Sequence, residues 1–159
     1  YPEKDDALTD IAETIEPDEV LLLVGDSIGG EGGLLGIVGS TPGTLLATPR
    51  AGVLISWLEG AGPDGLFSES EIQLLGETLA HEFGHYMGLY HPVESEYDAW
   101  DALEDTVECT EQAECERILK NNLMFPYPVC EAGNESACVA QTALTEEQAA
   151  VLHRYTGTR

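Results

Sequence analysis

Hydrophobic positions along the chain follow two different periods, and these predict where helices and strands form. The stretch "DDALTDIAETIE" spaces its apolar residues along one helix face and stops at Pro17, which predicts an amphipathic helix over 5–16. The short apolar runs in "EVLLLVGDS" and "AGVLISWLE" predict two buried strands. Between them, "GGEGGLLGIVGSTPG" has too much glycine for a helix and predicts a loop leading into a weak edge strand around 34–38.

The longest helical pattern is "SESEIQLLGETLAHEFGHYMGLY", in which Ser68 or Ser70 can cap the first turn and early glutamates favour the positive helix end. Residues 94–116 follow, with ten acidic residues and no basic one. Their scattered apolar positions predict a long surface loop with room for one short helix. The final "TEEQAAVLHRY" has a capping threonine, first-turn glutamates and an apolar face, which predict a terminal helix.

This order of elements predicts an α/β (α+β) fold, in which a small twisted mixed sheet packs on the long helix. An irregular, cysteine-bearing part follows and ends in the terminal helix. At 159 residues the chain is expected to form a single domain, 1–159, that buries its apolar surface without a partner. We expect an upper subdomain, 1–91, a lower subdomain, 92–159, and a monomer.

The composition is strongly acidic, with 30 acidic and 6 basic residues and a formal net charge of -24. This charge argues against nucleic acid and anionic membranes as partners, and no apolar run is long enough to cross a bilayer. It suits a solvated surface, cationic substrates, a salty environment or calcium, and composition does not choose among these. Structural Ca²⁺ stays open, although the acidic run lacks EF-hand spacing. Because the chain begins at Tyr1, we expect it to be processed or trimmed.

Four cysteines lie within the loop-rich part of the chain: Cys109, Cys115, Cys130 and Cys138. An even number in the least regular region predicts two disulfides and an oxidising compartment, hence a secreted, extracellular or periplasmic protein. The alternative is a cysteine zinc site, but no pair has the C-x-x-C spacing that such sites favour. The sequence leaves all three disulfide pairings open.

The stretch "HEFGHYMGLYH" carries the candidate chemistry. On a helix, residues four apart share one face, so His81 and His85 can direct two imidazoles at a single point. Glu82 lies beside them, where its carboxylate can hydrogen-bond to a water molecule at that point. This arrangement predicts two protein ligands of a catalytic Zn²⁺ and a general base next to them.

A third ligand is available if the helix ends soon after His85. Gly88 can adopt a left-handed conformation without steric cost, which ends the helix and turns the chain back towards the ion. His91 then reaches the same zinc, and the fourth position stays free for water. The remaining histidine, His153, is expected to be an ordinary surface or satisfied residue of the terminal helix.

These residues form the pattern HExxHxxGxxH, which resembles the metzincin clan of zinc endopeptidases. Downstream, "NNLMFP" resembles the methionine turn of that clan, with Met124 beneath the metal, and its Leu-Met-x-Pro form is most similar to matrix metalloproteinases and adamalysins. Astacin-like, serralysin-like and pappalysin-like members tend to carry tyrosine where this chain has Pro126. The "EDT" segment before Cys109 nevertheless resembles pappalysin-like or uncharacterised bacterial relatives, so the subfamily stays open. Archaemetzincins are excluded because their clustered cysteine ligands are missing.

The resemblance implies hydrolysis of peptide or protein substrates by a metal-activated water, with Glu82 as general base. It also implies an extended substrate along the edge strand, and a substrate pocket lined by Pro126 and Tyr127. The candidate residues of that edge strand are Gly36, Ile37, Val38 and Gly39. Two other classes are a catalytically silent zinc-binding interaction module and a calcium-responsive acidic module. The presence of Glu82 gives no sign of a lost activity.

Overall fold

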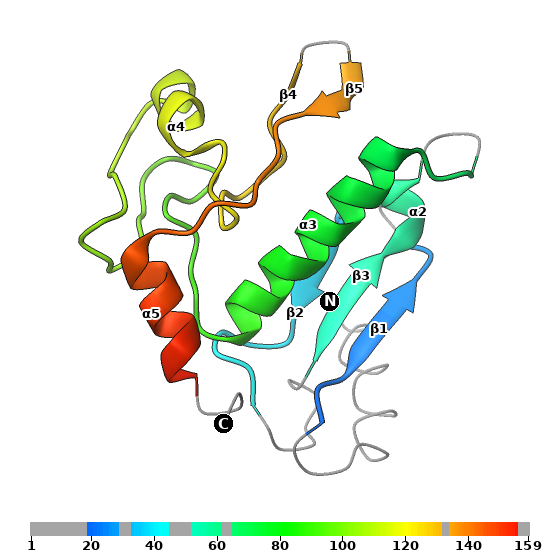
Figure 1. Cartoon of the computed structure of the whole chain (residues 1–159), viewed down its shortest axis with the longest axis horizontal. Coiled ribbons are helices and arrows are strands. Elements are labelled where there is room, and N and C mark those ends of the chain that lie inside the picture. The colour runs from blue at the N-terminus through cyan, green and yellow to red at the C-terminus, as the bar shows by residue number, and fades with distance from the viewer. Residues whose placement is uncertain (1–18, 29–32, 45–51, 62–64, 132–133, 156–159) are drawn as a thin grey trace.

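The computed structural model describes residues 19–28, 33–44, 52–61, 65–131 and 134–155. Its first sheet has three strands in the order β1-β3-β2: β1 spans Leu22–Gly25, β2 Gly36–Val38 and β3 Val53–Ser56. Strand β3 pairs parallel with β1 and antiparallel with β2. The long helix α3, Glu69–Tyr86, packs on this sheet and runs roughly along the direction of β3 (Figure 1). The chain therefore has the predicted α/β (α+β) architecture, with a small mixed sheet packed on the long helix.

The central strand β3 carries the core of the sheet. Val53 and Ile55 are buried together with Tyr86 of α3, and these three residues form one hydrophobic cluster. Partly buried side chains pack against this cluster: Val38, Leu75, Leu79, Phe83 and Tyr155. Three of these side chains recur every four residues along α3, which is the apolar helix face that the sequence pattern predicts.

The prediction that "EVLLLVGDS" forms a buried strand is wrong in one respect: the run forms strand β1, but β1 is not buried. Leu22 and Val24 are 40% and 59% exposed. The reason is that β1 is an edge strand, and alternate side chains of a strand lie on the same face. The run "AGVLISWLE" is buried as predicted in β3, but its strand ends at Ser56, and Trp57–Gly60 form the short helix α2.

Helix α3 begins and ends at sequence features that the pattern identified. The Ser68 hydroxyl accepts the Glu71 N–H, and the Glu71 carboxylate accepts the Ser68 N–H, which makes a capping box. At the other end, the helix ends at Tyr86, two residues before Gly88, and the Met87 N–H makes the last helical hydrogen bond, to the Phe83 carbonyl. The histidine motif therefore lies in the last turns of the helix and in the segment that leaves it.

The chain after His91 is mostly irregular and has its own buried cluster. Helix α4 spans Gln112–Leu119, the short strands β4 and β5 span Cys130–Glu131 and Asn134–Cys138, and α5 spans Glu146–Arg154. The β4–β5 hairpin was not foreseen from the sequence. Helix α5 begins as predicted, because Thr145 forms a capping box with Gln148. The second cluster consists of Val93, Cys109, Cys115, Leu119 and Phe125.

The structure resolves the pairing that the sequence left open. One disulfide joins Cys109 to Cys115, and the other joins Cys130 to Cys138. Two disulfides are typical of proteins from an oxidising environment. Among the described residues, no helix has the length and apolar character needed to cross a membrane. The helix predicted over 5–16 lies outside the described residues.

Candidate metal centre

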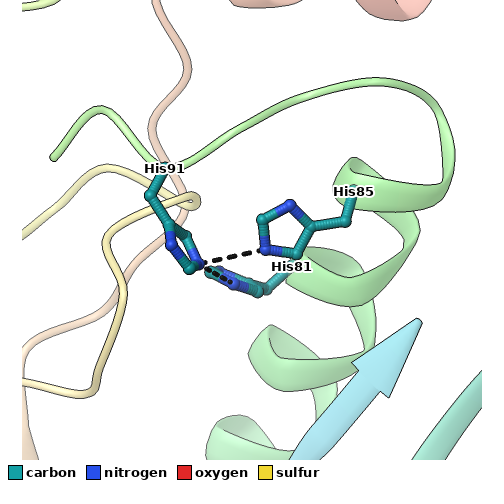
Figure 2. A group of neighbouring side chains, drawn as sticks. All are labelled: His81, His85 and His91. Carbon is teal, nitrogen blue, oxygen red and sulfur yellow. Dashed lines mark hydrogen bonds between the residues drawn. The ribbon is translucent and has the colours of Figure 1, made fainter. Parts of the chain in front are cut away.

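The three histidines of the motif converge on one point. Figure 2 shows His81 and His85 projecting from α3 and His91 meeting them from the segment beyond the helix. The Nε2 atom of His91 lies 3.2 Å from Nε2 of His81 and 3.0 Å from Nε2 of His85. Within the described ranges, these histidines form the one group of three or more His, Cys, Asp or Glu side chains placed to hold a metal ion. That part of the chain therefore offers no comparable carboxylate group for Ca²⁺.

The turn that brings His91 back to the helix begins at Gly88. Its φ of +102° lies in a region that side chains with a Cβ rarely adopt. The N–H groups of Gly88 and Leu89 donate to the carbonyls of His85 and Gly84 at 2.9 Å, which satisfies the open helix end. Gly88 thus occupies the helix-ending position that the sequence assigned to it.

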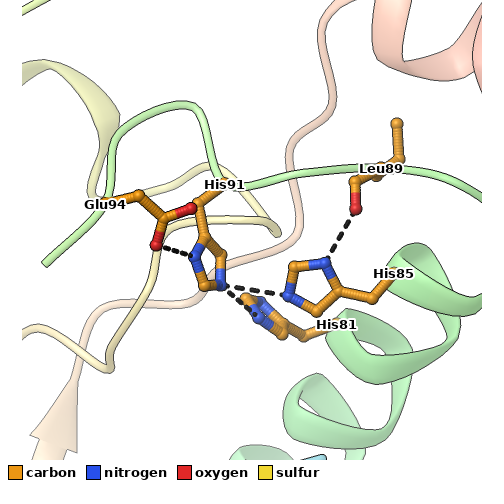
Figure 3. Close-up of polar contacts among 5 residues, drawn as sticks. All are labelled: His81, His85, Leu89, His91 and Glu94. Carbon is orange, nitrogen blue, oxygen red and sulfur yellow. Dashed lines mark hydrogen bonds and ion pairs between the residues drawn. The ribbon is translucent and has the colours of Figure 1, made fainter. Parts of the chain in front are cut away.

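Hydrogen bonds determine which nitrogen of each ring carries the proton. The Nδ1 atoms of His81 and His85 each lie 2.7 Å from a carbonyl oxygen, that of Leu123 and that of Leu89 respectively. The Nδ1 atom of His91 lies 2.9 Å from a carboxylate oxygen of Glu94 (Figure 3). These oxygens only accept hydrogen bonds, so each Nδ1 is the donor. In the neutral ring, each Nε2 then presents a lone pair, and all three lone pairs face the same point.

Lone pairs at such short distances need a proton or another cation between them. Burial is the largest cause that lowers the pKa of His81 to about 3, and it also lowers the pKa of His85. Protons are therefore disfavoured on two of the three rings. Two nitrogens that each lie 2.0–2.1 Å from a tetrahedral ion are about 3.3 Å apart, which is close to the separations of 3.0 and 3.2 Å found here. The cluster thus fits a metal ion held by three imidazoles.

Glu82 borders the same space as the histidines. It is only 7% exposed, and burial raises its pKa to about 7, a shift that a nearby cation would oppose. It lines a cavity of about 340 Å³ around the three rings and a neighbouring cavity of about 170 Å³. A Cβ at Gly36 would lie 2.6 Å from Cγ of Glu82, so glycine at this position leaves room for the glutamate side chain.

Met124 lies in a turn packed against α3. The side chain is fully buried, and a Cβ at Gly84 would lie 2.5 Å from its sulfur. The turn is held by Asn122, whose Oδ1 accepts the Met124 N–H at 2.8 Å. The carbonyl between these two residues, that of Leu123, accepts the hydrogen bond from His81 Nδ1. This turn therefore both packs against the histidine helix and orients one of its rings.

The candidate edge strand lies beside the larger cavity. Strand β2 is at the end of the sheet, and Gly36, Ile37 and Val38 line the cavity. Gly39 follows the strand, and its N–H donates to the Gly52 carbonyl at 3.1 Å. The structure thus brings a sheet edge next to the three histidines.

Pro126 lines both cavities, and Tyr127 lines the smaller one. The Tyr127 hydroxyl contacts the hydroxyl of Tyr97 and donates to Glu116 at 3.2 Å. Burial, followed by the contact with Tyr97, raises the pKa of Tyr127. The ring therefore contributes to a pocket wall while its oxygen is held by other partners. His153 lies elsewhere, exposed on α5, as expected.

Sequence reasoning missed two acidic residues at this centre. Glu94 orients His91, and Glu77 lines the smaller cavity one helical turn before His81. The spacing of Glu77 and His81, four residues apart on a helix, is a signal that could have placed Glu77 on the same face. Glu94 had no such signal, because it is one of many acids in the run that follows the motif.

Comparisons of the chain with models of protein families, with curated proteins and with solved structures find no match.

Proposed function

We propose that the chain is a zinc-dependent endopeptidase of metzincin type. The observation that carries this proposal is the convergence of three Nε2 lone pairs beside the buried carboxylate of Glu82, in a cavity large enough for substrate. Three imidazole ligands with a fourth position left for water are typical of catalytic zinc sites. The HExxHxxGxxH pattern and the methionine-bearing turn support the same reaction.

His81, His85 and His91 would hold the zinc ion, which would serve as a Lewis acid for a water molecule and for the scissile carbonyl. Glu82 takes a proton from the attacking water and later delivers it to the leaving amine. Gly36 leaves the space in which this carboxylate stands. Leu123, Leu89 and Glu94 hold the three rings in the tautomer that ligation needs.

The peptide substrate would lie extended along β2. An edge strand has backbone groups that can pair with an added strand, and residues 36–38 border the cavity that contains the histidines. Pro126 and Tyr127 would contact a substrate side chain in the smaller cavity. The two disulfides support a secreted enzyme that works in an oxidising compartment.

The alternative function is a zinc-binding interaction module without turnover, which would use the same three histidines. The buried carboxylate of Glu82 favours the peptidase over the interaction module. Burial of a carboxylate is costly, as its raised pKa indicates, and a purely structural zinc site has no need of it.

Metal content is the first test. The metal-free protein, titrated with zinc and analysed by mass spectrometry of the intact chain, should bind one Zn²⁺ through the three histidines. His91→Ala should bind zinc more weakly, whereas Glu82→Gln should keep the stoichiometry. Zinc binding that is unchanged in His91→Ala would contradict the metal centre.

Activity is the second test. The zinc-loaded protein should cleave members of a diverse peptide library, and a chelator should abolish the cleavage until zinc is restored. Glu82→Gln should lower kcat by about 10²- to 10⁴-fold while zinc stays bound. Zinc binding without any cleavage would favour the interaction module, and full activity of Glu82→Gln would overturn the assigned role of that residue.

A further inference from the structure

The smaller cavity beside the metal centre has the size and lining of a side-chain pocket. Its volume is about 170 Å³, whereas an engineered cavity of about 150 Å³ is enough to bind benzene. Much of its wall is apolar, formed by Leu34, Leu35, Leu74, Phe125, Pro126 and Pro128.

This pocket lies next to the reactive centre. His81, Glu82 and Pro126 line both the pocket and the larger cavity that holds the three histidines. A substrate side chain that enters the pocket from the larger cavity therefore belongs to a residue next to the bond placed at the metal. The side chain that the pocket prefers would therefore determine which peptide bond of the substrate is cleaved.

One carboxylate other than Glu82 lines the pocket, and it belongs to Glu77. Its Oε1 accepts a hydrogen bond from Gln73 Nε2 at 2.7 Å, and its Oε2 accepts one from the Gln141 N–H at 3.1 Å. These two bonds hold the carboxylate in place, and each oxygen retains capacity for a second donor. No lysine or arginine is among the described residues that line the pocket.

We propose that this pocket receives a lysine or arginine side chain of the substrate, with Glu77 as the residue that determines this specificity. The inference rests on the proposed peptidase function and names its substrate class. Lysine and arginine have apolar stems and a charged head, which match apolar walls with one fixed carboxylate. A purely apolar side chain would instead remove water from Glu77 and leave its negative charge with only the two neutral donors of Gln73 and Gln141.

Cleavage profiling of the zinc-loaded protein tests this specificity. The wild-type chain should cut a peptide library with lysine or arginine enriched at one fixed position next to the scissile bond. Glu77→Gln should lower kcat/KM for those peptides roughly 10- to 100-fold and leave peptides with leucine or methionine at that position nearly unchanged. Glu77→Lys should exclude basic residues and admit acidic ones.

The matched control is Glu69→Gln, which removes the same charge from an exposed residue of the same helix that does not line the pocket. It should leave the cleavage profile unchanged. If both variants reduce the preference equally, the net charge of the chain rather than the pocket selects the substrate, and the proposal is wrong.

A binding measurement without metal separates the pocket from the reaction. Benzamidine, a small planar cation, should shift the amide resonances of Gln141 and its neighbours in the metal-free protein, with affinity at least tenfold weaker in Glu77→Gln. Equal affinity in both proteins overturns the pocket assignment. Cleavage with no basic preference overturns it while leaving the peptidase proposal intact, and absence of any cleavage by the zinc-loaded chain overturns both.

Discussion

At His91, the position of a single proton decides whether the ring can bind a metal. The Nδ1–H of His91 donates a hydrogen bond to the Glu94 carboxylate. The lone pair on Nε2 therefore remains free to bind an ion. The side chain of Glu94 is 45% exposed, which weakens the electrostatic part of the contact but not its effect on the tautomer. We expect Glu94→Ala to raise the dissociation constant for zinc about 10-fold, at the weaker end of such effects, as measured by competition with a chromophoric chelator.

Two further variants separate orientation from charge. Glu94→Gln retains an acceptor oxygen and should restore much of the affinity. Glu96→Ala removes an exposed acid two residues further along, and should change zinc binding little. Equal losses in Glu94→Ala and Glu96→Ala would show that the general field of the acidic run, rather than the ring contact, is responsible.

Two glycines of α3 should respond to alanine in opposite ways. At Gly84 a new Cβ would meet the buried Met124 sulfur at 2.5 Å, whereas at Gly76 it would meet nothing within 4 Å. We therefore expect Gly84→Ala to lower the free energy of unfolding by about 1–3 kcal/mol. Gly76→Ala should raise it by about 0.5–1 kcal/mol, because alanine is the better helix former. Urea denaturation of both metal-free variants checks the signs, and stabilisation by Gly84→Ala would mean that Met124 does not pack as described.

At the scale of elements, the end of α3 does most to assemble the site. Two of the three clustered histidines lie on the helix and the third lies beyond it, so the angle at which the chain leaves the helix determines where His91 lies. That exit is made by Gly88 at a φ of +102°.

We expect Gly88→Ala to cost about 1–3 kcal/mol of stability, because alanine is strained at this φ. It should also weaken zinc binding, since relief of the strain moves His91 away from the other two rings. Gly88→Asn should be milder on both counts, because asparagine tolerates positive φ better than other residues with a Cβ. Thermal unfolding with and without zinc measures both effects, and an alanine variant as stable and as tight-binding as wild type would contradict this account.

At the scale of the whole molecule, two buried clusters lie on either side of His91 in the chain. One is built on the sheet and α3, and the other includes the Cys109–Cys115 disulfide. The second disulfide, Cys130–Cys138, joins β4 to β5, and Cys130 is exposed. The two bonds close loops of similar length, with sequence separations of 6 and 8.

These loop lengths predict that chain entropy contributes about 2.5 kcal/mol for each disulfide. The Cys109→Ala/Cys115→Ala pair should cost about 1–2 kcal/mol more than the Cys130→Ala/Cys138→Ala pair, because it also removes sulfur atoms from the buried cluster. Chemical denaturation of both double variants gives the comparison. Equal losses would show that packing around the buried disulfide adds nothing.

The sequence alone determined those features that depend on neighbours a few residues apart. The serine cap of α3, for which the pattern offered Ser68 or Ser70, the Thr145 cap of α5, the helix end before Gly88 and the meeting of His81 with His85 all follow from local geometry. The buried strand β3 and the edge position of β2 also followed from the pattern, because burial and glycine content leave a local trace, but the pattern did not distinguish β3 from the exposed strand β1.

Only the tertiary structure decided the contacts between distant segments. The acceptor for His81 Nδ1 is 42 residues away, and the backbone donor to Glu77 is 64 residues away. The disulfide pairing, the exposure of β1 and the residues that line both cavities likewise depend on how separate segments pack. Residue periodicity reports which face of an element is apolar, but it carries no information on which distant segment covers that face. The grouping of His81, His85 and His91 could therefore be inferred from the sequence, whereas the partners that orient these rings and the pocket beside them could not.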